Sequence, residues 1–201
     1  ADNDSGLDAT GNYAVAEGSG TTASGIVSHA EGLGTIASGN TSHAEGQFTQ
    51  AIGVGSHAQG YYTIASGDYS HAEGAGSTSI GPQSHAEGAS LATGLAAHSE
   101  GFSTTANGLG SHAEGYATIA VAYYSHAGGN SSIASGDTSF IHSTNSFAFG
   151  ARSAVLGGQN ITGTTADTVY VPDFVIKKAA AIPSNSADLT VGEAGSITWD
   201  D

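Results

Sequence analysis

Small side chains alternate with larger ones along this chain, and the pattern repeats every 14 residues. Within residues 35–46, the words Ile-Ala-Ser (36–38) and His-Ala-Glu (43–45) each place alanine between two other side chains. Successive side chains of a strand point to opposite faces, so each word predicts a three-residue strand with alanine on one face. One repeat therefore predicts two short strands, with Ala37 and Ala44 facing each other across a gap that only alanine fills.

The repeat is most regular at histidine. Each histidine lies in the word Ser-His-Ala-Glu-Gly or a close relative, and the spacing is 14 residues except for one 13-residue step. The histidines of this column are His29, His43, His57, His71, His85, His98, His112 and His126. A period this short, with glycine closing each half, predicts a solenoid whose coils pair in parallel about 4.8 Å apart.

The ends of the two words predict turns. Gly39 and Gly46 are expected to turn the chain at positive φ. The hydroxyls of Thr35 and Ser42 are expected to form hydrogen bonds with the turn backbone.

The composition indicates a thin core. The chain has 201 residues, of which 31 are Gly and none Met, and Trp199 is its only tryptophan. Alanine buries little apolar area, so a single roll would be weakly stabilised. We therefore expect flat rolls to associate side by side, and three copies around an axis give the simplest closed assembly.

The charge of the chain excludes several partners. The net charge is −15, with Arg152, Lys177 and Lys178 as the only basic residues. Nucleic acid and anionic membranes need a cationic face, so neither is an expected partner. There is no run of 18 apolar residues to cross a membrane, and no cysteine for disulfides or thiolate metal sites. The chain lacks an initiator Met and a signal peptide, which suggests a piece of a longer protein that continues beyond Asp201.

The word Asn-Ser-Phe-Ala-Phe-Gly (145–150) and the recurring Ser-x-Ala-x-Gly words carry a family resemblance. They resemble the head repeats of trimeric autotransporter adhesins, the YadA-like left-handed parallel β-roll, whose consensus is Asn-Ser-Val-Ala-Ile-Gly followed by Ser-x-Ala-x-Gly. The Ser-His-Ala-Glu-Gly variety also resembles repeats of phage tail fibres. The resemblance spans roughly residues 11–158 and implies an intertwined homotrimer in an extracellular, non-catalytic fibre. The chain is expected to depart from the family by placing His and Glu where the consensus has Val and Ile.

Three segments are expected. Residues 1–12 form a lead-in, residues 13–158 the β-roll, and residues 159–201 a β-rich neck or connector. The run 167–176 contains Pro172, which excludes an interior strand position. This run resembles the β-prism that follows such heads in phage-type fibres, and a final short strand is expected within 195–201.

The two outer faces of the roll differ. One carries the more invariant set, which favours it as the interface between chains: His29, Glu31, His43, Glu45, His71, Glu73, His85, Glu87, His112 and Glu114. The other carries a varied, more apolar set that includes Ile36, Gln50, Ile64, Ile80 and Val121. Spacing alone leaves open which face is inward. Phe140 and His142 continue the first face, and Phe147 and Phe149 continue the second.

Histidine columns have two other interpretations. Imidazole suits Zn, Cu, Fe or Ni, so a string of metal sites is possible, with His43, His71, His85 and His112 as candidates. Stacked histidines also respond to pH near neutrality. However, a ligand repeated in every coil is more typical of architecture, so structural His–Glu pairing across chains is preferred and no cofactor is expected.

Aromatic residues cluster at the turns. They are Phe48, Tyr61, Tyr62, Tyr69, Phe102, Tyr116, Tyr123 and Tyr124. They either pack on neighbouring coils or contact a receptor or glycan. A threonine column that includes Thr21, Thr35 and Thr49 resembles ice-binding solenoids. An ice-binding face needs paired threonine ranks on a flat sheet, whereas this column is expected at the strand edges, so ice binding is not favoured.

The sequence favours an attachment fibre at a virion tail or a bacterial surface over an enzyme. Glycan hydrolysis needs a distinct pair of carboxylates in a groove, and the glutamate column offers none. A Ser-His-Asp triad is excluded because neighbouring Ser and His point to opposite faces of one strand. The phage tail fibre is preferred, a bacterial adhesin head is the alternative, and a fibre-borne glycan-degrading or self-cleaving module is the enzymatic alternative.

Overall fold

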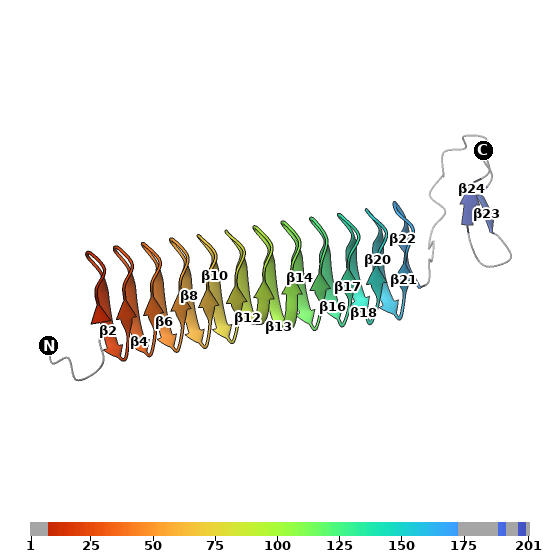
Figure 1. Ribbon diagram of the computed structural model, residues 1–201. Coiled ribbons are helices and arrows are strands. Elements are labelled where there is room, and N and C mark those ends of the chain that lie inside the picture. Colours follow the sequence, from red (N-terminus) through yellow and green to blue (C-terminus); the bar gives the residue numbers. More distant parts are fainter. Residues whose placement is uncertain (1–7, 173–188, 192–196, 200–201) are drawn as a thin grey trace.

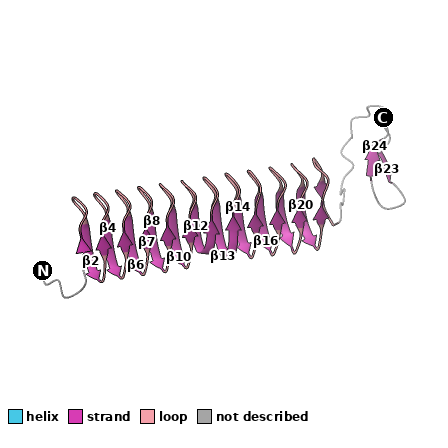
Figure 2. Ribbon diagram, in the orientation of Figure 1, coloured by secondary structure: helices cyan, strands magenta, loops and turns pink. Residues whose placement is uncertain are grey.

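The computed structural model describes residues 8–172, 189–191 and 197–199. Residues 8–172 form a rod of about twelve stacked coils (Figure 1). Every coil is built from strands joined by turns at both edges of the roll (Figure 2). The fold is therefore an all-β parallel solenoid, as the 14-residue repeat predicted.

Each coil contributes one strand to each of two parallel ranks. The first rank contains β2 (Val15–Ser19), β4 (His29–Leu33), β6 (His43–Gln47), β8 (His57–Tyr61), β10 (His71–Ala75), β14 (His112–Tyr116), β16 (His126–Asn130), β18 (Phe140–Thr144), β20 (Ala154–Gln159) and β22 (Val169–Tyr170). The second contains β1 (Asp8–Ala9), β3 (Thr22–Ala23), β5 (Ile36–Ala37), β7 (Gln50–Ala51), β9 (Ile64–Ala65), β11 (Thr78–Ser79), β15 (Ile119–Ala120), β17 (Ile133–Ala134), β19 (Phe147–Ala148) and β21 (Thr162–Gly163). The longer strands β12 (His85–Ala92) and β13 (His98–Ala106) belong to both.

Most strands pair with the equivalent residues one coil away. His43 lies opposite His57, and Ala44 opposite Ala58, so each column of the sequence becomes a column in space. The coil that starts at His85 is one residue short, and its strand runs through to Ala92 with a bulge between Ala89 and Leu91. The missing residue is thus absorbed at one turn, and the histidine column stays in register.

The roll extends beyond the expected range of 13–158 at both ends. Asp8–Ala9 pairs with Thr22–Ala23, and Val169–Tyr170 pairs with Ala154–Val155. The start of the expected connector is therefore the last rung of the roll, with Pro172 just after it. Residues 173–188 lie outside the described residues. The predicted final strand is present as β24 (Ile197–Trp199), antiparallel to β23 (Leu189–Val191).

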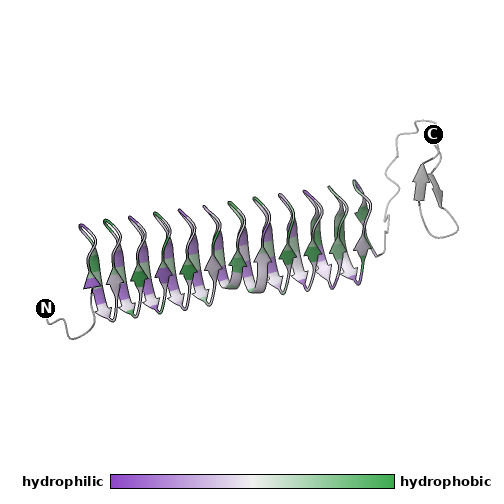
Figure 3. Cartoon of the chain, viewed as in Figure 1, coloured by the Kyte–Doolittle hydropathy of each residue, from purple (hydrophilic) through white to green (hydrophobic). Residues whose placement is uncertain are grey.

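Alanine fills the space between the two ranks. Ala44, Ala72 and Ala113 are fully buried, as the sequence predicted. Where serine replaces alanine, its hydroxyl finds a partner inside the roll: Ser99 Oγ lies 2.9 Å from Thr104 Oγ1. Among the described residues, apolar side chains larger than alanine are fully buried only near the C-terminal end, at Ile141 and Val155. Polar and apolar residues recur within every coil along the rod (Figure 3).

Contrary to the sequence prediction, Gly39 and Gly46 do not both turn the chain at positive φ. Gly46 does have a positive φ of 109°, but it lies inside the five-residue strand β6. Gly39 is absent from the positive-φ positions; a Cβ there would lie 1.9 Å from the carbonyl oxygen of Gly53. The strands therefore have five and two residues instead of three, and left-handed turn residues such as Phe48 (φ 56°) reverse the chain.

The hydroxyl columns line the interior. Ser42 donates a hydrogen bond to the Gly39 carbonyl at 2.7 Å, as expected. Thr35 is fully buried, and its hydroxyl has no hydrogen-bond partner, which differs from the expectation. Because Thr21, Thr35 and Thr49 are buried, their hydroxyls cannot form an ice-binding face. Nowhere in the described segments is there a helix with the length and apolar character needed to cross a membrane.

Candidate functional site: the His–Glu ladder

The histidine column and the acidic column two residues later form one continuous outer surface on the first rank of strands, which we term the His–Glu ladder. The rings of successive histidines from His29 to His112 lie 4.8–4.9 Å apart and within 7° of parallel. This stacking follows from the parallel, in-register strands, which place identical side chains one layer apart. The predicted stacking of His rings is thus present within a single chain.

Six of the eight histidines in the column lie within 4 Å of the glutamate of the preceding coil, and His71 and His98 do not. His57 Nε2 lies 3.2 Å from Glu45 Oε1, and His112 Nε2 lies 3.3 Å from Glu100 Oε1. The other contacts of this kind join His29 to Glu17, His43 to Glu31, His85 to Glu73 and His126 to Glu114. The side chains are about one-third exposed, so these contacts are only partly shielded from water.

Close stacking opposes charge on the histidines. The pKa of His43 and of His71 lies below the ordinary value because of burial first, and then because of the neighbouring histidines. The same causes, burial first, lower the pKa of His98 and of His126. These four imidazoles therefore favour the neutral form at neutral pH.

Carboxylates also come close to one another in the middle of the ladder. A hydrogen bond with Glu100, burial and the charge of Glu100 raise the pKa of Glu87 to about 7, with Glu73 adding to the shift. The same hydrogen bond lowers the pKa of Glu100. The protonated Glu87 thus donates to the Glu100 carboxylate, and two acidic residues share one proton near neutral pH.

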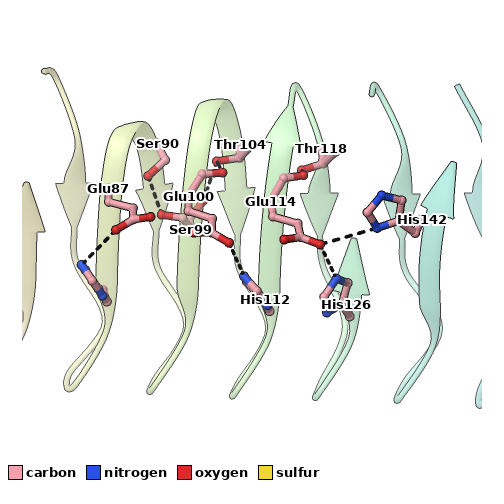
Figure 4. A network of polar contacts seen from close by, with 11 residues as sticks. Glu87, Ser90, Ser99, Glu100, Thr104, His112, Glu114, Thr118, His126 and His142 are labelled. Carbon is pink, nitrogen blue, oxygen red and sulfur yellow. Dashed lines mark hydrogen bonds and ion pairs between the residues drawn. The ribbon is translucent and has the colours of Figure 1, made fainter. Parts of the chain in front are cut away.

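The ladder changes at its C-terminal end. Gly128 stands where other coils have Glu, and His142 occupies the equivalent position one coil later. The ring of His126 is rotated 72° from that of His112, which ends the parallel stack. Glu114 Oε1 lies 3.2 Å from His126 Nε2 and 3.5 Å from His142 Nδ1 (Figure 4). Three coils thus bring two imidazoles and a carboxylate together.

The sequence did not predict this convergence. It identified His142 as a continuation of the face and gave no role to Gly128. The sequence signal that could have predicted it is Gly128 between a coil with Glu114 and a coil with His142. Because glycine has no side chain, it leaves space for the longer side chains of the coils on either side.

Three of the four histidines that the sequence offered as metal ligands lie in groups of possible ligand atoms, and the fourth does not. His43, with Glu45 and His57, and His85, with Glu87 and His98, belong to groups whose ligand atoms lie within 4.8 Å of one another. His112 belongs to a similar group with Glu100 and Glu114. His71 belongs to no such group in the described residues, because the neighbouring coil has Gln59 in place of Glu.

The turn aromatics lie at both edges of the roll. At one edge, Tyr61 and Tyr116 are the last residues of β8 and β14, Phe102 lies within β13, and Phe48 and Tyr62 follow β6 and β8. At the other edge, Tyr69, Tyr123 and Tyr124 precede strands of the first rank. Phe48 stacks on Tyr62 at 4.9 Å, and Phe102 on Tyr116 at 5.6 Å. All eight nevertheless expose more than a third of their surface. The aromatics therefore pack on neighbouring coils and remain open to a partner.

The opposite outer face, which we term the isoleucine face, follows the second rank of strands. It exposes Ile36, Ile52, Ile80, Val121 and Phe149. Phe147 pairs with Ile133, whereas His126 pairs with Phe140. The Val and Ile of the consensus word therefore correspond to the isoleucine face, and His and Glu occupy the variable positions of Ser-x-Ala-x-Gly. The expectation that His and Glu replace the consensus Val and Ile was wrong.

Stacked 14-residue coils with an alanine core define this part of the chain as a parallel β-solenoid module of a fibrous protein. The family model described as the YadA head domain repeat matches residues 30–49, 51–70 and 72–90. The chain thus contains YadA head domain repeats, which are typical of adhesin-type surface fibres. No curated protein matches the chain.

Proposed function

We propose that this chain is a segment of a homotrimeric, non-enzymatic extracellular fibre used for attachment to a cell surface. The observation that carries the proposal is a solenoid with an alanine core that leaves large apolar side chains, interspersed with polar ones, exposed on one face. Exposed contiguous apolar surface marks an interface. The match to YadA head repeats supports the adhesin-type role.

The isoleucine face is the better candidate for the threefold interface. Ile80 is 48% exposed and Phe149 49%, and covering them would supply apolar burial that the alanine core lacks. The His–Glu ladder, by contrast, has polar contacts between its own coils, such as those of His43 with Glu31 and of His57 with Glu45. We therefore propose that the isoleucine face lies inward, in place of the His–Glu face favoured by the sequence.

With this arrangement, the ladder and both turn edges face outward. Tyr69, Tyr123 and Tyr124 then lie on one exposed edge. Tyrosine rings offer flat apolar faces with a polar end, which suits protein receptors and glycans. We propose these rings as contacts to a cell-surface receptor or glycan.

A phage tail fibre and a bacterial surface adhesin head both use such a shaft. The resemblance of the Ser-His-Ala-Glu-Gly words to repeats of phage tail fibres favours the tail fibre. The YadA repeat match favours the bacterial adhesin. Antibodies against the roll, used in immunogold electron microscopy of the producing cells and of induced phage particles, distinguish the two: label on tails supports the first, and label on cell envelopes supports the second.

The interface test is sedimentation of the purified chain. Ile64→Asp with Ile80→Asp should convert a trimer to monomer, since three copies of each charge would be buried at the axis. His71→Asp with His85→Asp, on the other face, is the matched control and should leave the trimer intact. A folded wild-type monomer at micromolar concentration would exclude the trimer, and dissociation by the control pair alone would place the His–Glu ladder inside.

Binding and catalysis are tested separately. Loss of adhesion to host cells in Tyr69→Ser with Tyr124→Ser, with the trimer retained, supports the aromatic contact. Adhesion equal to wild type would contradict it. Turnover of capsule polysaccharide by the purified trimer would favour the enzymatic alternative.

A further inference from the structure

In the regular part of the His–Glu ladder, the candidate metal groups with two histidines, those of His43 with His57 and of His85 with His98, are poorly arranged to hold an ion, and the group around His112 offers only one imidazole. The rings of His43 and His57 are within 4° of parallel and 4.9 Å apart. The nitrogen lone pair of an imidazole lies in the ring plane, so parallel rings direct their lone pairs side by side instead of toward one point. A single ion cannot bind both rings unless one of them tilts.

The C-terminal end of the ladder does not have this limitation. His126 has left the parallel stack, and the His126 and His142 side chains approach Glu114 Oε1 from two different coils (Figure 4). His126 offers Nε2 and His142 offers Nδ1, and the three ligand atoms lie within 4.8 Å of one another. The distances of 3.2 and 3.5 Å from the carboxylate oxygen are close to the ~3.3 Å between ligands of a tetrahedral zinc ion with bonds of about 2.0 Å.

Gly128 leaves the space for this arrangement. A Cβ at Gly128 would lie 2.7 Å from His142 Nδ1 and 3.0 Å from Glu114 Oε1. Both side chains therefore extend across the position where the repeat normally places glutamate. The glycine is not needed for backbone conformation, because its φ is not among the positive values.

We propose that Glu114, His126 and His142 bind a divalent first-row transition metal ion, such as Zn²⁺. Two imidazoles and one carboxylate form a known ligand set for such ions and leave further coordination positions open. Magnesium and calcium prefer all-oxygen sites and would bind weakly here. The His142 side chain is 59% exposed, so an ion can enter directly from solvent.

An ion at this position would join three consecutive strands, β14, β16 and β18. It would link them where Ile141 replaces the core alanine. The proposal concerns one chain and does not depend on the trimer or on attachment.

The test is titration of the untagged, metal-free protein with Zn²⁺ by calorimetry, and with Co²⁺ by visible absorption, which reports coordination geometry. We expect one tight site per chain and a melting temperature that rises with Zn²⁺. His142→Ala should weaken binding at least tenfold and abolish the Zn²⁺-dependent rise. Because this side chain is exposed, the variant should fold, which circular dichroism checks.

His43→Ala is the matched control, since it removes a ladder histidine from the parallel stack and should leave the tight site unchanged. Equal Zn²⁺ affinity and stoichiometry in wild type and His142→Ala would overturn the proposal. Several equivalent sites weakened as much by His43→Ala would also overturn it, because they would assign binding to the whole ladder.

Discussion

The ring of Tyr69 lies over Gly55, the equivalent turn residue one coil earlier. A Cβ added at Gly55 would lie 2.9 Å from Tyr69 Cδ1. The same relationship joins Gly110 to Tyr124, with a distance of 2.9 Å, and Gly34 to Phe48, with a distance of 2.7 Å. A glycine in one coil thus provides the surface on which an aromatic ring of the next coil packs.

Two glycine substitutions should therefore differ sharply. Gly55→Ala should cost about 1 kcal/mol, the low end of the usual cost of a left-handed residue other than glycine, because the Tyr69 ring can move and Ala96 already adopts this conformation at the equivalent turn position. Gly39→Ala should abolish folding or lower the melting temperature severely, because its Cβ would meet the Gly53 carbonyl, which is part of the backbone. Thermal melts of the two variants measure the difference, and similar melts would contradict the close stacking at Gly39.

Enlarging the core should be costly. Ala72→Leu should destabilise each chain by about 1–3 kcal/mol, because Ala72 is fully buried between closely spaced strands. Ala75→Leu, at an exposed position of the same strand, is the control and should change stability little. Denaturant unfolding of both variants checks this, and an unchanged midpoint for Ala72→Leu would argue against the alanine core.

Acidification should weaken the roll through the histidines. The folded pKa values of His43 and His71 lie below the ordinary 6.5, so the stability they contribute is present above that pH and is lost as the pH falls below it. Replacing both with Val should reduce the loss of unfolding free energy between pH 7.5 and 5.5 by a few tenths of a kcal/mol per site, since the groups are partly exposed. The melting temperature should then fall less over this pH range. Melts at a series of pH values test this, and an unchanged pH dependence would count against the histidine stack as its cause.

Glu87 should give the stability a pH dependence of the opposite sign to that of the histidines. Its folded pKa of about 7 exceeds the ordinary 4.5, so its contribution is greatest below pH 4.5 and is lost as the pH rises through 7. Glu87→Gln keeps a donor toward Glu100 without titrating, and should stabilise the protein by roughly 0.2–1 kcal/mol at pH 8 and less at pH 5. Glu31→Gln, which removes an ordinary contact with His43, should give no such gain. A gain for Glu87→Gln that does not change with pH would rule out the shared proton.

The alanine spacing was enough to predict the two-sheet roll, because a 14-residue period admits one register and places Ala44 inside. It was not enough to predict strand lengths. The left-handed conformation of Phe48 is imposed by turn geometry on a residue type that rarely adopts it, and the need for glycine at position 39 arises from the backbone of the next coil. The residues next to Phe48 and Gly39 in the sequence therefore predict neither the left-handed turn nor the need for glycine.

The sequence likewise predicted the regular part of the candidate site but not its C-terminal end. In-register strands stack identical residues, so the histidine column followed directly from the repeat. The meeting of Glu114 with His142 did not, because it depends on how two side chains bend over Gly128 from separate coils. Periodic positions can be assigned from sequence, whereas the structure is needed where the period is broken.

The short coil that begins at His85 shows how such a shaft can change its reach. One residue is lost at a turn near Ser90, yet His85 and His98 remain stacked at 4.8 Å with parallel rings. The spacing between layers is therefore the same for the 13-residue coil as for the 14-residue coils. Duplication or deletion of one whole repeat would lengthen or shorten the roll by about 4.8 Å and leave the surface chemistry of every other coil unchanged.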